Sequence, residues 1–596
     1  MPPVKEPEPV VALCGKLPVL VAESRVDRWV WGVFAGVAIF AYAVGMHAYW
    51  SPAHPGVDQN GYLVGGKFFA QTWSTGFKPS DPFAFVGRMW VEVDGGRYFP
   101  KYPMGLSVIY AIALKIGGAK FGVPLAFMVN PVAMALGIVA TFLIARLMAG
   151  SFAAMLAAII TATSPVTLGL TNNPNSHATA VCFVAWGVYL LLRWWQSNGI
   201  WRAIGAGFFL GMAVTIRYTE GLLFLPLMLV ALLNLRWRNK RSWIETAVLA
   251  GAWGMPVLIL AAYNWFSFHH LTGYDPTNES TGFSWDYFQD NWETMVRQLY
   301  TTGLFFILPF SILGLVLMWR WNWRVAMVLT VWIVPNLGLY TAYYWAPDGT
   351  WIAYLRFFLT IFPALVVAAV WTFRRFIELA ARDGSRIAPR IAIGVIVAIG
   401  CGMSLNTALA EVENDAAGNL VLAVAGQTIV RDCPAGSMIF GQDRFLNYVQ
   451  LIGNYRLYDY QQFSRPTIQR FAHVDLDQPN GLQPQRAKEM YDRLKDASEA
   501  DLIREQNKLM ADAFASGKRV FFLVSTNAMN QATRFLPRRL FDQHVVGVWE
   551  ELGDNRPVRK RPWVGFAGQR NAQGDQAKST IWEIMEVTPV AKRAAK

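Results

Sequence analysis

The sequence predicts a mainly α-helical protein, in which a polytopic bundle of about 11–13 transmembrane helices is followed by a C-terminal α/β domain outside the membrane. The chain has 596 residues, of which 54% are hydrophobic and 14% are aromatic. Only 16% are charged, whereas soluble domains average about 25%. Apolar runs recur up to residue 410 and then give way to a more charged sequence. This composition argues against a disordered chain and against an ordinary cytosolic enzyme.

The apolar runs are long enough, or nearly so, to cross a bilayer, which takes about 20 residues in a helix. We expect spans at residues 29–49, 121–145, 150–170, 177–195, 203–217, 219–236, 243–266, 301–319, 325–345, 355–373 and 391–409. No small-residue cleavage pattern follows the first run, so we expect it to remain as an uncleaved span. A further run at 104–118 is short for a crossing, and we expect a juxtamembrane or re-entrant helix there.

Basic residues predict the orientation of this bundle, because cytoplasmic loops carry an excess of Lys and Arg. Each basic loop is separated from the next by two expected spans. These loops lie at 146, 193–202, 236–241, 320–324 and 374–390. We therefore expect all of them on the cytoplasmic side, together with the N-terminal segment 1–28. The net charge of +13 is then a signal of topology, and we reject a nucleic-acid-binding function.

The loops on the opposite face carry nearly all of the unusual polar residues in the membrane half. They lie at 50–103, 171–176, 217–219, 267–300 and 346–354. We therefore expect the chemistry of this protein to face the periplasm or an equivalent lumen.

Three parts are predicted along the chain. They are a cytoplasmic segment 1–28, a transmembrane domain 29–410 with the large first outer loop 50–103, and a periplasmic α/β domain 411–596. In the last part, runs rich in Val, Ile and Phe predict strands at Met438–Gly441, Arg519–Ser525, His544–Trp549 and Thr580–Val587. Helical patterns lie between them, at Gln485–Lys495 and Ala500–Ala515. This alternation indicates an α/β domain, which we expect to cover a site or dock a partner rather than to act as an independent enzyme.

The sequence indicates no metal site. Its four cysteines are scattered without a CxxC pair, so neither a disulfide framework nor a zinc ribbon is predicted. The outer loops contain no Asp-x-Asp motif that would hold the metal of a nucleotide donor. No cofactor is certain; a divalent metal is compatible with the sequence but not indicated by it.

The first outer loop contains two candidate residues. Asp58 is either a solvated loop residue or a general base held at the membrane rim. Lys101 lies between two prolines, just before an apolar run. It could extend to lipid headgroups, or it could bind a lipid-linked phosphate as a point charge. Pro103 fits the first turn of the helix that follows.

Arg217 and Glu220 lie in the shortest outer turn, between two apolar runs. A charged pair at the ends of two spans is costly unless it faces protein or water. The two side chains could satisfy each other at i, i+3. Arg217 could instead bind phosphate oxygens bidentately, and we favour this function. Arg356, just inside a later span, is a second cation that could reach a bound phosphate.

Histidines and tyrosines complete the polar set. His177 follows an Asn-rich turn and could be a base, a metal ligand or, as we favour, a polar residue at the start of a helix capped by the Ser176 hydroxyl. His269 directly precedes His270, and adjacent side chains diverge, so we propose no zinc site there. Tyr344 lies at interface depth, where an aromatic belt is usual.

Six short motifs follow one another along the membrane half. They are Asp58-Gln59-Asn-Gly-Tyr62, Lys101-Tyr-Pro103-Met-Gly105, Ser164-Pro165, Arg217-Tyr-Thr with Leu225-Pro226-Leu227, Asn264-Trp-Phe-Ser-Phe268 with Thr272-Gly-Tyr274, and Arg356 leading to Pro363-Ala364. Their order resembles that of the GT-C superfamily of membrane glycosyltransferases, above all its protein O-mannosyltransferase and aminoarabinose lipid A transferase branches. The resemblance covers roughly residues 29–410. One departure is Gln59, which stands where these enzymes frequently have a second acid.

The resemblance implies a GT-C-type fold and an inverting, single-displacement transfer of a sugar from a polyprenyl-phosphate donor. It implies Asp58 as the general base, and it implies donor-phosphate ligands at Lys101, Arg217 and Arg356. Substrate-lining side chains would be Tyr62, His177, Glu220, His269 and Tyr344. The implied partners are a polyprenyl-phosphate-linked sugar, membrane lipids, and a lipid, glycan or protein acceptor. The branch favours a bacterial inner membrane.

Other functional classes stay open on sequence grounds. A polytopic transporter or flippase of a lipid-linked or small substrate would have a similar number of spans. Such proteins place polar residues near the membrane midplane in two repeated halves, and no repeat is detectable here. A non-catalytic membrane scaffold is a third interpretation. An oligosaccharide ligase would differ in acceptor and donor size rather than in topology.

Overall fold

The computed structural model of the chain is largely helical and divides into two compact units. It describes residues 23–93, 95–274, 282–347, 352–381, 385–471, 484–525, 541–551 and 580–589. Unit 1 comprises Met1–Trp50, Tyr102–Leu106 and Met128–Glu411. Unit 2 comprises Ser51–Lys101, Ser107–Phe127 and Val412–Lys596. The first outer loop and the C-terminal part of the chain therefore belong to the same unit.

Several of the described helices are apolar and long enough to cross a membrane. Seven pass this test by length and composition: α1 (Arg25–Ala48), α3 (Gly105–Ala149), α6 (Ser176–Ser197), α9 (Lys240–Phe268), α13 (Trp323–Thr341), η3 with α14 (Leu355–Ala380) and α15 (Ile387–Asp432). Two bent pairs raise the number to nine: α4 (Ser151–Thr163) with α5 (Pro165–Thr171), and Trp285–Gly303 with α12 (Ile307–Trp321). Two shorter apolar helices are α7 (Ile200–Ile216) and η1 with α8 (Tyr218–Asn234).

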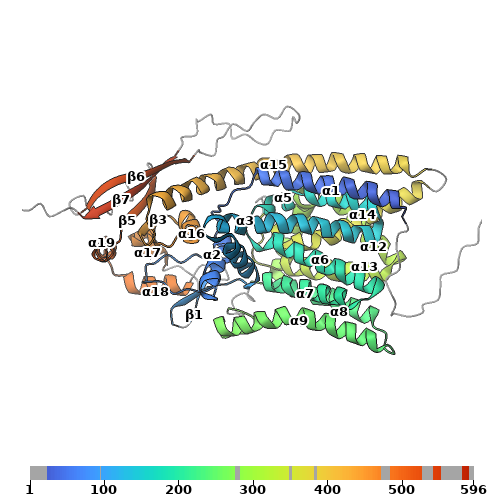
Figure 1. Cartoon of the computed structure of the whole chain (residues 1–596), viewed down its shortest axis with the longest axis horizontal. Helices are drawn as coiled ribbons and strands as arrows, with labels where there is room; N and C mark the ends of the chain where they lie inside the picture. The colour runs from blue at the N-terminus through green and yellow to red at the C-terminus, as the bar shows by residue number, and fades with distance from the viewer. Residues whose placement is uncertain are drawn as a thin grey trace, which may run out of the picture. The chain divides into compact units, whose positions relative to one another are not determined.

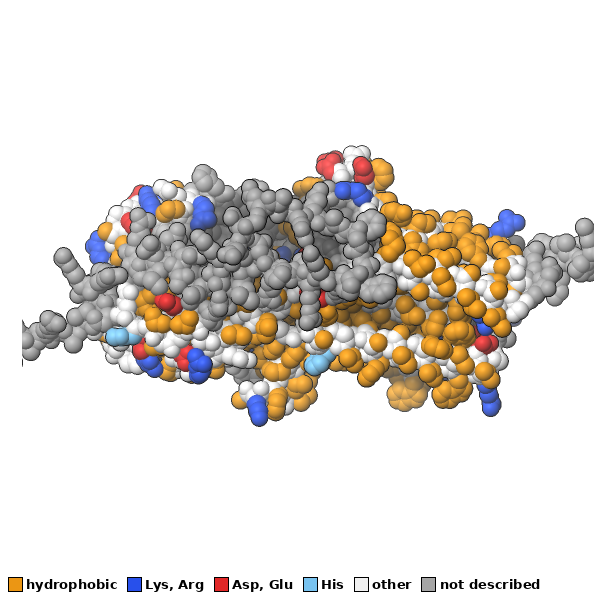
Figure 2. All heavy atoms as spheres, turned by 90° about the horizontal axis from the view of Figure 1, so that it is seen from above, with side chains coloured by type: hydrophobic (Ala, Val, Ile, Leu, Met, Phe, Trp, Pro, Cys, Tyr) orange, Lys and Arg blue, Asp and Glu red, His pale blue; other side chains and the backbone are white. Residues whose placement is uncertain are grey.

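Every span expected from the sequence falls on one of these helices, which confirms the polytopic bundle. Within it, α7 packs against both α6 and α9, and the three helices run side by side in Figure 1. Hydrophobic side chains cover much of the surface over the apolar helices in Figure 2. Apolar side chains suit the hydrocarbon of a lipid bilayer. The helical backbone suits it as well, because a helix satisfies its backbone hydrogen bonds internally. The protein is an integral, multi-pass membrane protein.

Helix α3 is broken near its start, in the region where the sequence predicts a separate short helix. Gly118 has φ +57° and ψ −155°, which lie outside the helical region. A Cβ placed on Gly122 would lie 2.7 Å from the carbonyl oxygen of Leu114. Residues that far apart in a continuous helix would be separated by about 12 Å, so the chain turns back on itself here. The segment before Gly118 is therefore a separate short helix, as expected.

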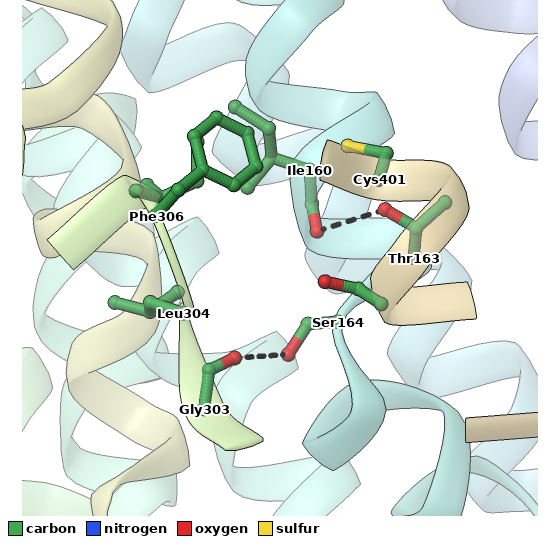
Figure 3. Close-up of a pocket in the computed structure, with 9 residues that line it drawn as sticks. Ile160, Thr163, Ser164, Gly303, Leu304, Phe306 and Cys401 are labelled. Atoms are coloured by element: carbon green, nitrogen blue, oxygen red, sulfur yellow. Dashed lines mark hydrogen bonds between the residues drawn. The ribbon is translucent and has the colours of Figure 1, made fainter. Parts of the chain in front are cut away.

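Ser164 and Pro165 divide the span expected at 150–170 into α4 and α5, which are bent by 59°. Pro165 lies in the first turn of α5, where its missing N–H leaves no helix hydrogen bond unmade. The hydroxyl of Ser164 donates to the carbonyl oxygen of Gly303 at 3.0 Å. Figure 3 shows this contact beside a cavity of about 10 Å³, which has room for about one water molecule. The Ser-Pro motif therefore bends one expected span, and Ser164 connects this bend to Gly303.

The last apolar helix continues beyond the membrane-like sequence. The expected span ends at residue 409, but α15 runs without a break to Asp432. Its final part belongs to unit 2. Hydropathy marks where the apolar sequence ends, whereas Glu, Ala and Leu maintain the helix because they are strong helix formers in any solvent.

Unit 2 contains a mixed sheet with the strand order β4-β3-β5-β7-β6. The strands are β3 (Met438–Gly441), β4 (Arg456–Asp459), β5 (Val520–Ser525), β6 (Phe541–Glu551) and β7 (Thr580–Pro589). The first three pair in parallel, while β7 runs antiparallel to both β5 and β6. The helices are α16 (Asp443–Ile452), α17 (Arg465–Phe471), α18 (Pro484–Leu494) and α19 (Glu499–Ala515). All four predicted strands and both predicted helices are present, which confirms the α/β domain, and α16, α17 and β4 are additional.

The hydrophobic core of unit 2 draws on two distant stretches of sequence. Phe83 and Ala84 of the first outer loop pack with sheet residues such as Phe440 and Phe522. The ring of Phe83 stacks on that of Phe463, with centroids 4.8 Å apart. Beyond this contact the loop forms a hairpin of β1 (Trp90–Val93) and β2 (Arg97–Pro100). The outer loop is therefore a structural part of the α/β unit.

Candidate functional site

The predicted base Asp58 lies in the first turn of α2 (Val57–Thr72), in unit 2. Gly56 precedes this helix in an extended conformation, and the side-chain amide of Gln59 lies against it. Asp58 is half-buried, while the residues from Gln59 to Gly66 are all buried. A carboxylate is electrostatically favoured at the N-terminus of a helix. Asp58 therefore lies at an accessible end of α2, next to its buried middle part.

Two polar side chains of α2 anchor it to the C-terminal part of unit 2. The Asn60 amide donates to Oε1 of Gln450 at 3.0 Å. The Lys67 ammonium donates to the carbonyl oxygens of Gln450 and Gly453, at 2.7 and 2.6 Å. Burial lowers the pKa of Lys67 to about 8. Both anchors lie on the helix that carries Asp58, so they restrict where its carboxylate can be.

Tyr62 and Lys101 also belong to unit 2. Tyr62 is buried, and its carbonyl oxygen accepts a hydrogen bond from Ser107 at 3.0 Å. Lys101 is half-buried, and its backbone N–H donates to the carbonyl oxygen of Met89 at 3.0 Å. Pro103 precedes α3 rather than lying in its first turn, so this detail of the sequence prediction was wrong. The backbone bond positions Lys101 at the end of the β-hairpin.

Arg217 is the centre of a buried hydrogen-bonded network in unit 1. It directly follows α7 and is 9% exposed. Its Nη1 lies 2.6 Å from Nδ1 of His177, and its Nη2 donates to the Tyr340 hydroxyl at 2.5 Å. Because a guanidinium can only donate, His177 must accept with Nδ1. Arg217 Nε lies 3.5 Å from Oε1 of Glu220, so the pair at i, i+3 is formed and faces protein.

Aromatic rings connect Arg217 to Arg356. The ring of Phe357 stacks on that of Tyr340, with centroids 4.8 Å apart and planes inclined by 17°. The Arg217 guanidinium lies 5.9 Å from the Phe357 ring centre. That of Arg356 lies 5.1 Å from Phe357 and 4.9 Å from Trp345, within the range of cation–π attraction. We call these five residues the arginine–aromatic cluster; Arg356 is its more accessible cation.

Tyr344 lies at the edge of this cluster. Its ring contacts that of Tyr343 at 4.8 Å, and Tyr343 in turn contacts Phe357 at 5.6 Å. Tyr344, predicted as part of an aromatic belt, therefore connects through Tyr343 to the aromatic rings of the cluster. Neither Tyr340 nor Phe357 was predictable as a site residue, because both lie inside apolar runs where an aromatic residue is ordinary.

Asn175, and not Ser176, caps the helix after the Asn-rich turn. The Asn175 side chain accepts a hydrogen bond from the His177 N–H at 3.1 Å. Ser176 is already helical, and its hydroxyl accepts from Arg217 at 3.3 Å. The Ser176 cap was a wrong prediction because both residue types cap well, and the backbone decides which one stays outside the helix. The buried His177 ring meets Phe357 edge-on at 6.0 Å, so it faces the arginine–aromatic cluster.

The Asn264 motif anchors the turn that follows α9. Asn264 accepts from the Tyr218 hydroxyl at 3.1 Å and donates to the carbonyl oxygen of Leu271 at 3.0 Å. Gly273 has φ +106°, and a Cβ there would lie 2.6 Å from the Tyr218 hydroxyl. His269 ends α9 in the left-handed conformation, and its side chain is exposed. The structure therefore brings His177 and Glu220 to Arg217 but leaves His269 on the surface.

In the part of the chain that the structure describes, no group of three His, Cys, Asp or Glu side chains is arranged to hold a metal ion. Cys182, Cys401 and Cys433 are buried free thiols, and Cys14 lies outside the described residues.

These features define a class of protein: a multi-pass membrane protein with cations at helix ends and an additional α/β unit. Comparison with known families makes the class more specific. Residues 101–260 match the family model described as dolichyl-phosphate-mannose-protein mannosyltransferase. This segment contains Lys101, His177, Arg217 and Glu220.

The fold is similar to that of ArnT from Cupriavidus metallidurans in the apo state, with a TM-score of 0.52 and 13% identity over 88% of this chain and 97% of that chain. The resemblance to the GT-C superfamily is thereby confirmed. ArnT bound to undecaprenyl phosphate gives a TM-score of 0.48 at 13% identity, over 93% and 98% of the two chains. The Archaeoglobus fulgidus oligosaccharyltransferase tethered to an acceptor peptide gives 0.45 at 11% identity, over 86% and 71%. No curated protein sequence matches the chain.

Proposed function

We propose that this protein is a membrane glycosyltransferase that moves a sugar from a polyprenyl-phosphate donor to an acceptor. The observation that carries the proposal is the match of residues 101–260 to a family described by its use of dolichyl-phosphate mannose. The matched segment begins at Lys101 and includes Arg217, two of the cations that we assign to the donor phosphate. The GT-C-type fold supports the same class of reaction.

The proposed reaction is an inverting single displacement. An acceptor oxygen attacks the anomeric carbon of the sugar, and the bond from that carbon to the phosphate oxygen breaks. The acceptor proton passes to a general base, while the bonding electrons leave with polyprenyl phosphate. Negative charge therefore grows on the phosphate, where preorganised cations lower the barrier. The polyprenyl tail stays in lipid, so the reaction takes place at the rim of the membrane.

We assign the base to Asp58. Its carboxylate is half-buried at the first turn of α2, and Asn60 and Lys67 anchor that helix. A carboxylate held this way keeps a defined position without losing access to an acceptor. A positioned base typically contributes about 10²–10⁴-fold to the rate.

We assign the binding of the donor phosphate to Lys101, Arg356 and Arg217, and we give each of them a different role. Arg356 presents a half-buried guanidinium beside two aromatic rings, and a guanidinium can hold phosphate oxygens bidentately. Lys101 would act as a point charge. Arg217 already donates to His177 and Tyr340, so we assign to it mainly the positioning of the arginine–aromatic cluster. The substrate-lining roles stay predictions for Tyr62, His177, Glu220, His269 and Tyr344.

We further propose that the transfer occurs at the periplasmic face of a bacterial inner membrane. Segment 1–28 would then lie in the cytoplasm and residues 411–596 in the periplasm. The distribution of basic loops along the sequence supports this orientation. The acceptor would be a lipid, a glycan or a protein.

The proposal predicts that purified full-length protein in liposomes releases polyprenyl phosphate from at least one polyprenyl-phosphate sugar. We expect Asp58→Asn to lower kcat by about 10²–10⁴-fold, because the amide cannot accept the acceptor proton. Release is measured by mass spectrometry over a panel of donors, with lipid, glycan and peptide acceptors.

The matched control is Glu92→Gln, a second acid of the same loop whose carboxylate accepts a hydrogen bond from Tyr98 at 2.6 Å. This variant should keep its activity. Turnover that survives in Asp58→Asn contradicts the base assignment but leaves the glycosyltransferase in place. If the wild type releases polyprenyl phosphate from no donor, a transporter, a flippase or a membrane scaffold becomes the better description.

A further inference from the structure

An open cavity of about 590 Å³ lies at the N-terminal end of α1. The residues that line it are Arg25, Arg28, Trp29, Gly32, Val33 and Arg146. Five come from α1, and Arg146 comes from the last turn of α3. All six belong to unit 1, so the cavity is a feature of one compact unit. None of the residues that we assign to transfer lines it.

Three arginines bring three positive charges to this cavity. The nearby carboxylates face other groups: Asp27 pairs with Arg390 at 3.4 Å, and Glu23 accepts hydrogen bonds from Ser151. Among the described residues, no ion pair joins a carboxylate to any of the three lining arginines.

The position of the arginines increases their need for an anion. Arg25 and Arg28 lie in the first turns of α1, where the helix dipole already presents positive partial charge. Arg25 and Arg28 are unfavourable at that end of a helix, and Arg146, from the last turn of α3, adds a third positive charge that repels them. A bound anion would relieve both effects.

The rest of the cavity wall is apolar and open. The side chains of Trp29 and Val33 are 75% and 57% exposed. No heavy atom lies within 4 Å of where a Cβ on Gly32 would be, so the helix surface is indented there. Only 17% of the apolar window of α1 is buried, which leaves the helix to face lipid. The cavity thus combines cations at a helix end with an apolar surface that runs toward the membrane.

We propose that this cavity binds an anionic phospholipid, with its phosphate on the arginines and an acyl chain against Trp29, Gly32 and Val33. A guanidinium matches phosphate oxygens bidentately, and a basic pocket beside membrane helices suits an anionic headgroup. A free phosphate would use the cations alone, whereas a phospholipid uses the cations and the apolar surface together. This lipid is neither donor nor acceptor of the sugar.

The proposal is tested with the purified full-length protein in neutral detergent, by native mass spectrometry and by thermal unfolding. The additives are phosphatidylglycerol, phosphatidylcholine and inorganic phosphate. Wild type should bind and be stabilised by phosphatidylglycerol more than by either of the others. Arg25→Gln with Arg28→Gln should weaken phosphatidylglycerol binding about thirtyfold, because each basic residue contributes about 1 kcal/mol and a factor of ten is 1.4 kcal/mol.

Two further variants keep the test decisive. Arg238→Gln with Arg320→Gln removes the same charge from exposed arginines elsewhere in unit 1 and should leave binding unchanged. Gly32→Leu keeps all three arginines, has room for its side chain and should weaken phosphatidylglycerol binding by filling the indentation.

Three results would overturn the proposal. Equal binding of phosphatidylglycerol and phosphatidylcholine would mean that the arginines do not select the headgroup. Equal losses in the two double variants would mean that only net charge matters. Stabilisation by inorganic phosphate that matches the lipid, with no effect of Gly32→Leu, would assign the cavity to a soluble anion.

Discussion

Arg217 and Arg356 carry the same charge but have different surroundings. Arg217 is 9% exposed and directs its donors to His177 and Tyr340, with Glu220 as its counter-ion. Arg356 is half-buried beside Trp345. A buried charge is retained only with partners in place. The first cation therefore serves the architecture, and the second has more capacity to bind a ligand.

We expect Arg217→Gln to destabilise the protein, because Glu220, 2% exposed, would be left without its cation. Removing one partner of a buried pair costs about 3–5 kcal/mol, and the additional change Glu220→Gln should restore part of this. Arg356→Gln should instead raise the KM for the donor with little change in Tm. Tryptophan fluorescence on heating and donor titrations measure the two effects. An unchanged donor KM in Arg356→Gln would remove this residue from the phosphate site.

His54 gives unit 2 a dependence on pH. It is 1% exposed, and its ring lies 5.9 Å from that of Phe127 and 6.2 Å from that of Tyr448. Burial lowers its pKa to about 3, whereas an unfolded chain has a histidine pKa of about 6.5. Between these values the unfolded state binds a proton that the folded state does not, so stability falls as the pH falls. Above about pH 6.5 the stability is fully present.

From pH 7 to pH 5 the free energy of unfolding should fall by about 2 kcal/mol, at 1.36 kcal/mol for each pH unit below 6.5. His54→Phe should flatten this dependence, because the new side chain does not titrate. The measurement is Tm against pH, with the exposed His47→Gln as the control. The same slope in wild type and His54→Phe would show that another group is responsible.

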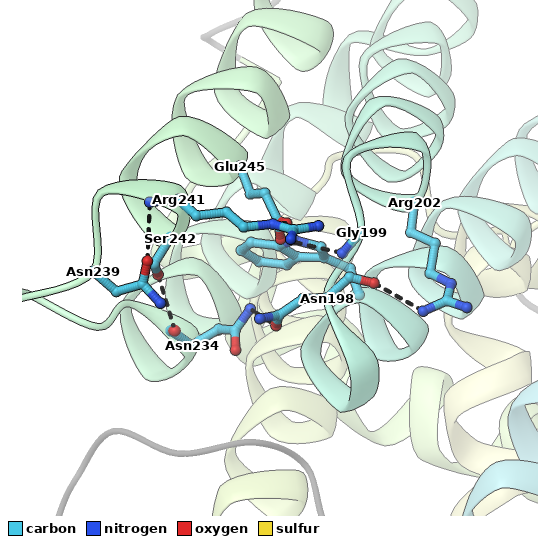
Figure 4. A network of polar contacts seen from close by, with 9 residues as sticks. Asn198, Gly199, Arg202, Asn234, Asn239, Arg241, Ser242 and Glu245 are labelled. Carbon is cyan, nitrogen blue, oxygen red and sulfur yellow. Dashed lines mark hydrogen bonds and ion pairs between the residues drawn. The ribbon is translucent and has the colours of Figure 1, made fainter.

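At the scale of helices, one buried carboxylate joins three elements. Glu245 of α9 is 3% exposed and accepts from the Trp194 indole at 3.0 Å and from the Gly199 N–H at 3.2 Å (Figure 4). These donors lie on α6 and in the turn before α7. Further along, a Cβ on Gly207 would lie 2.3 Å from the carbonyl oxygen of Leu249, so α7 and α9 touch through their backbones. Charge-assisted bonds at one end and a small residue along the contact explain why α7 packs tightly between its neighbours.

At the scale of the whole chain, unit 2 is assembled from the outer loop, the turn of α3 and the C-terminal part. The Tyr448 hydroxyl donates to the carbonyl oxygen of Pro52 at 2.7 Å, and the Phe85 N–H donates to that of Leu457 at 2.7 Å. The C-terminal part thus supports the loop that carries Asp58. If the C-terminal part only covered a site, it would not need these hydrogen bonds to the outer loop.

Deleting the chain after Asp432 should therefore loosen α2. We expect amide exchange in α2 to become at least about tenfold faster, because the contacts that oppose local opening of this helix are removed. Transfer activity should be lost in the same variant. Hydrogen exchange followed by mass spectrometry measures both α2 and, as an internal control, α6 of unit 1. Unchanged protection of α2 would mean that the outer loop folds without the C-terminal part.

Local features were predictable from the sequence. Hydropathy predicted the spans, the Val- and Phe-rich runs predicted four strands, and spacing at i, i+3 predicted that Arg217 and Glu220 could pair. Each of these follows from residues that are neighbours along the chain. The order of the motifs was enough to indicate the GT-C-type fold.

Only the tertiary structure decided which residues surround the cations and which segments fold together. Tyr340 reaches Arg217 across 123 positions, and Asn60 reaches Gln450 across 390. The choice of Asn175 over Ser176 as a cap likewise depended on the backbone path and not on residue preference. Such contacts depend on packing between distant segments, and neither hydropathy nor spacing contains that information.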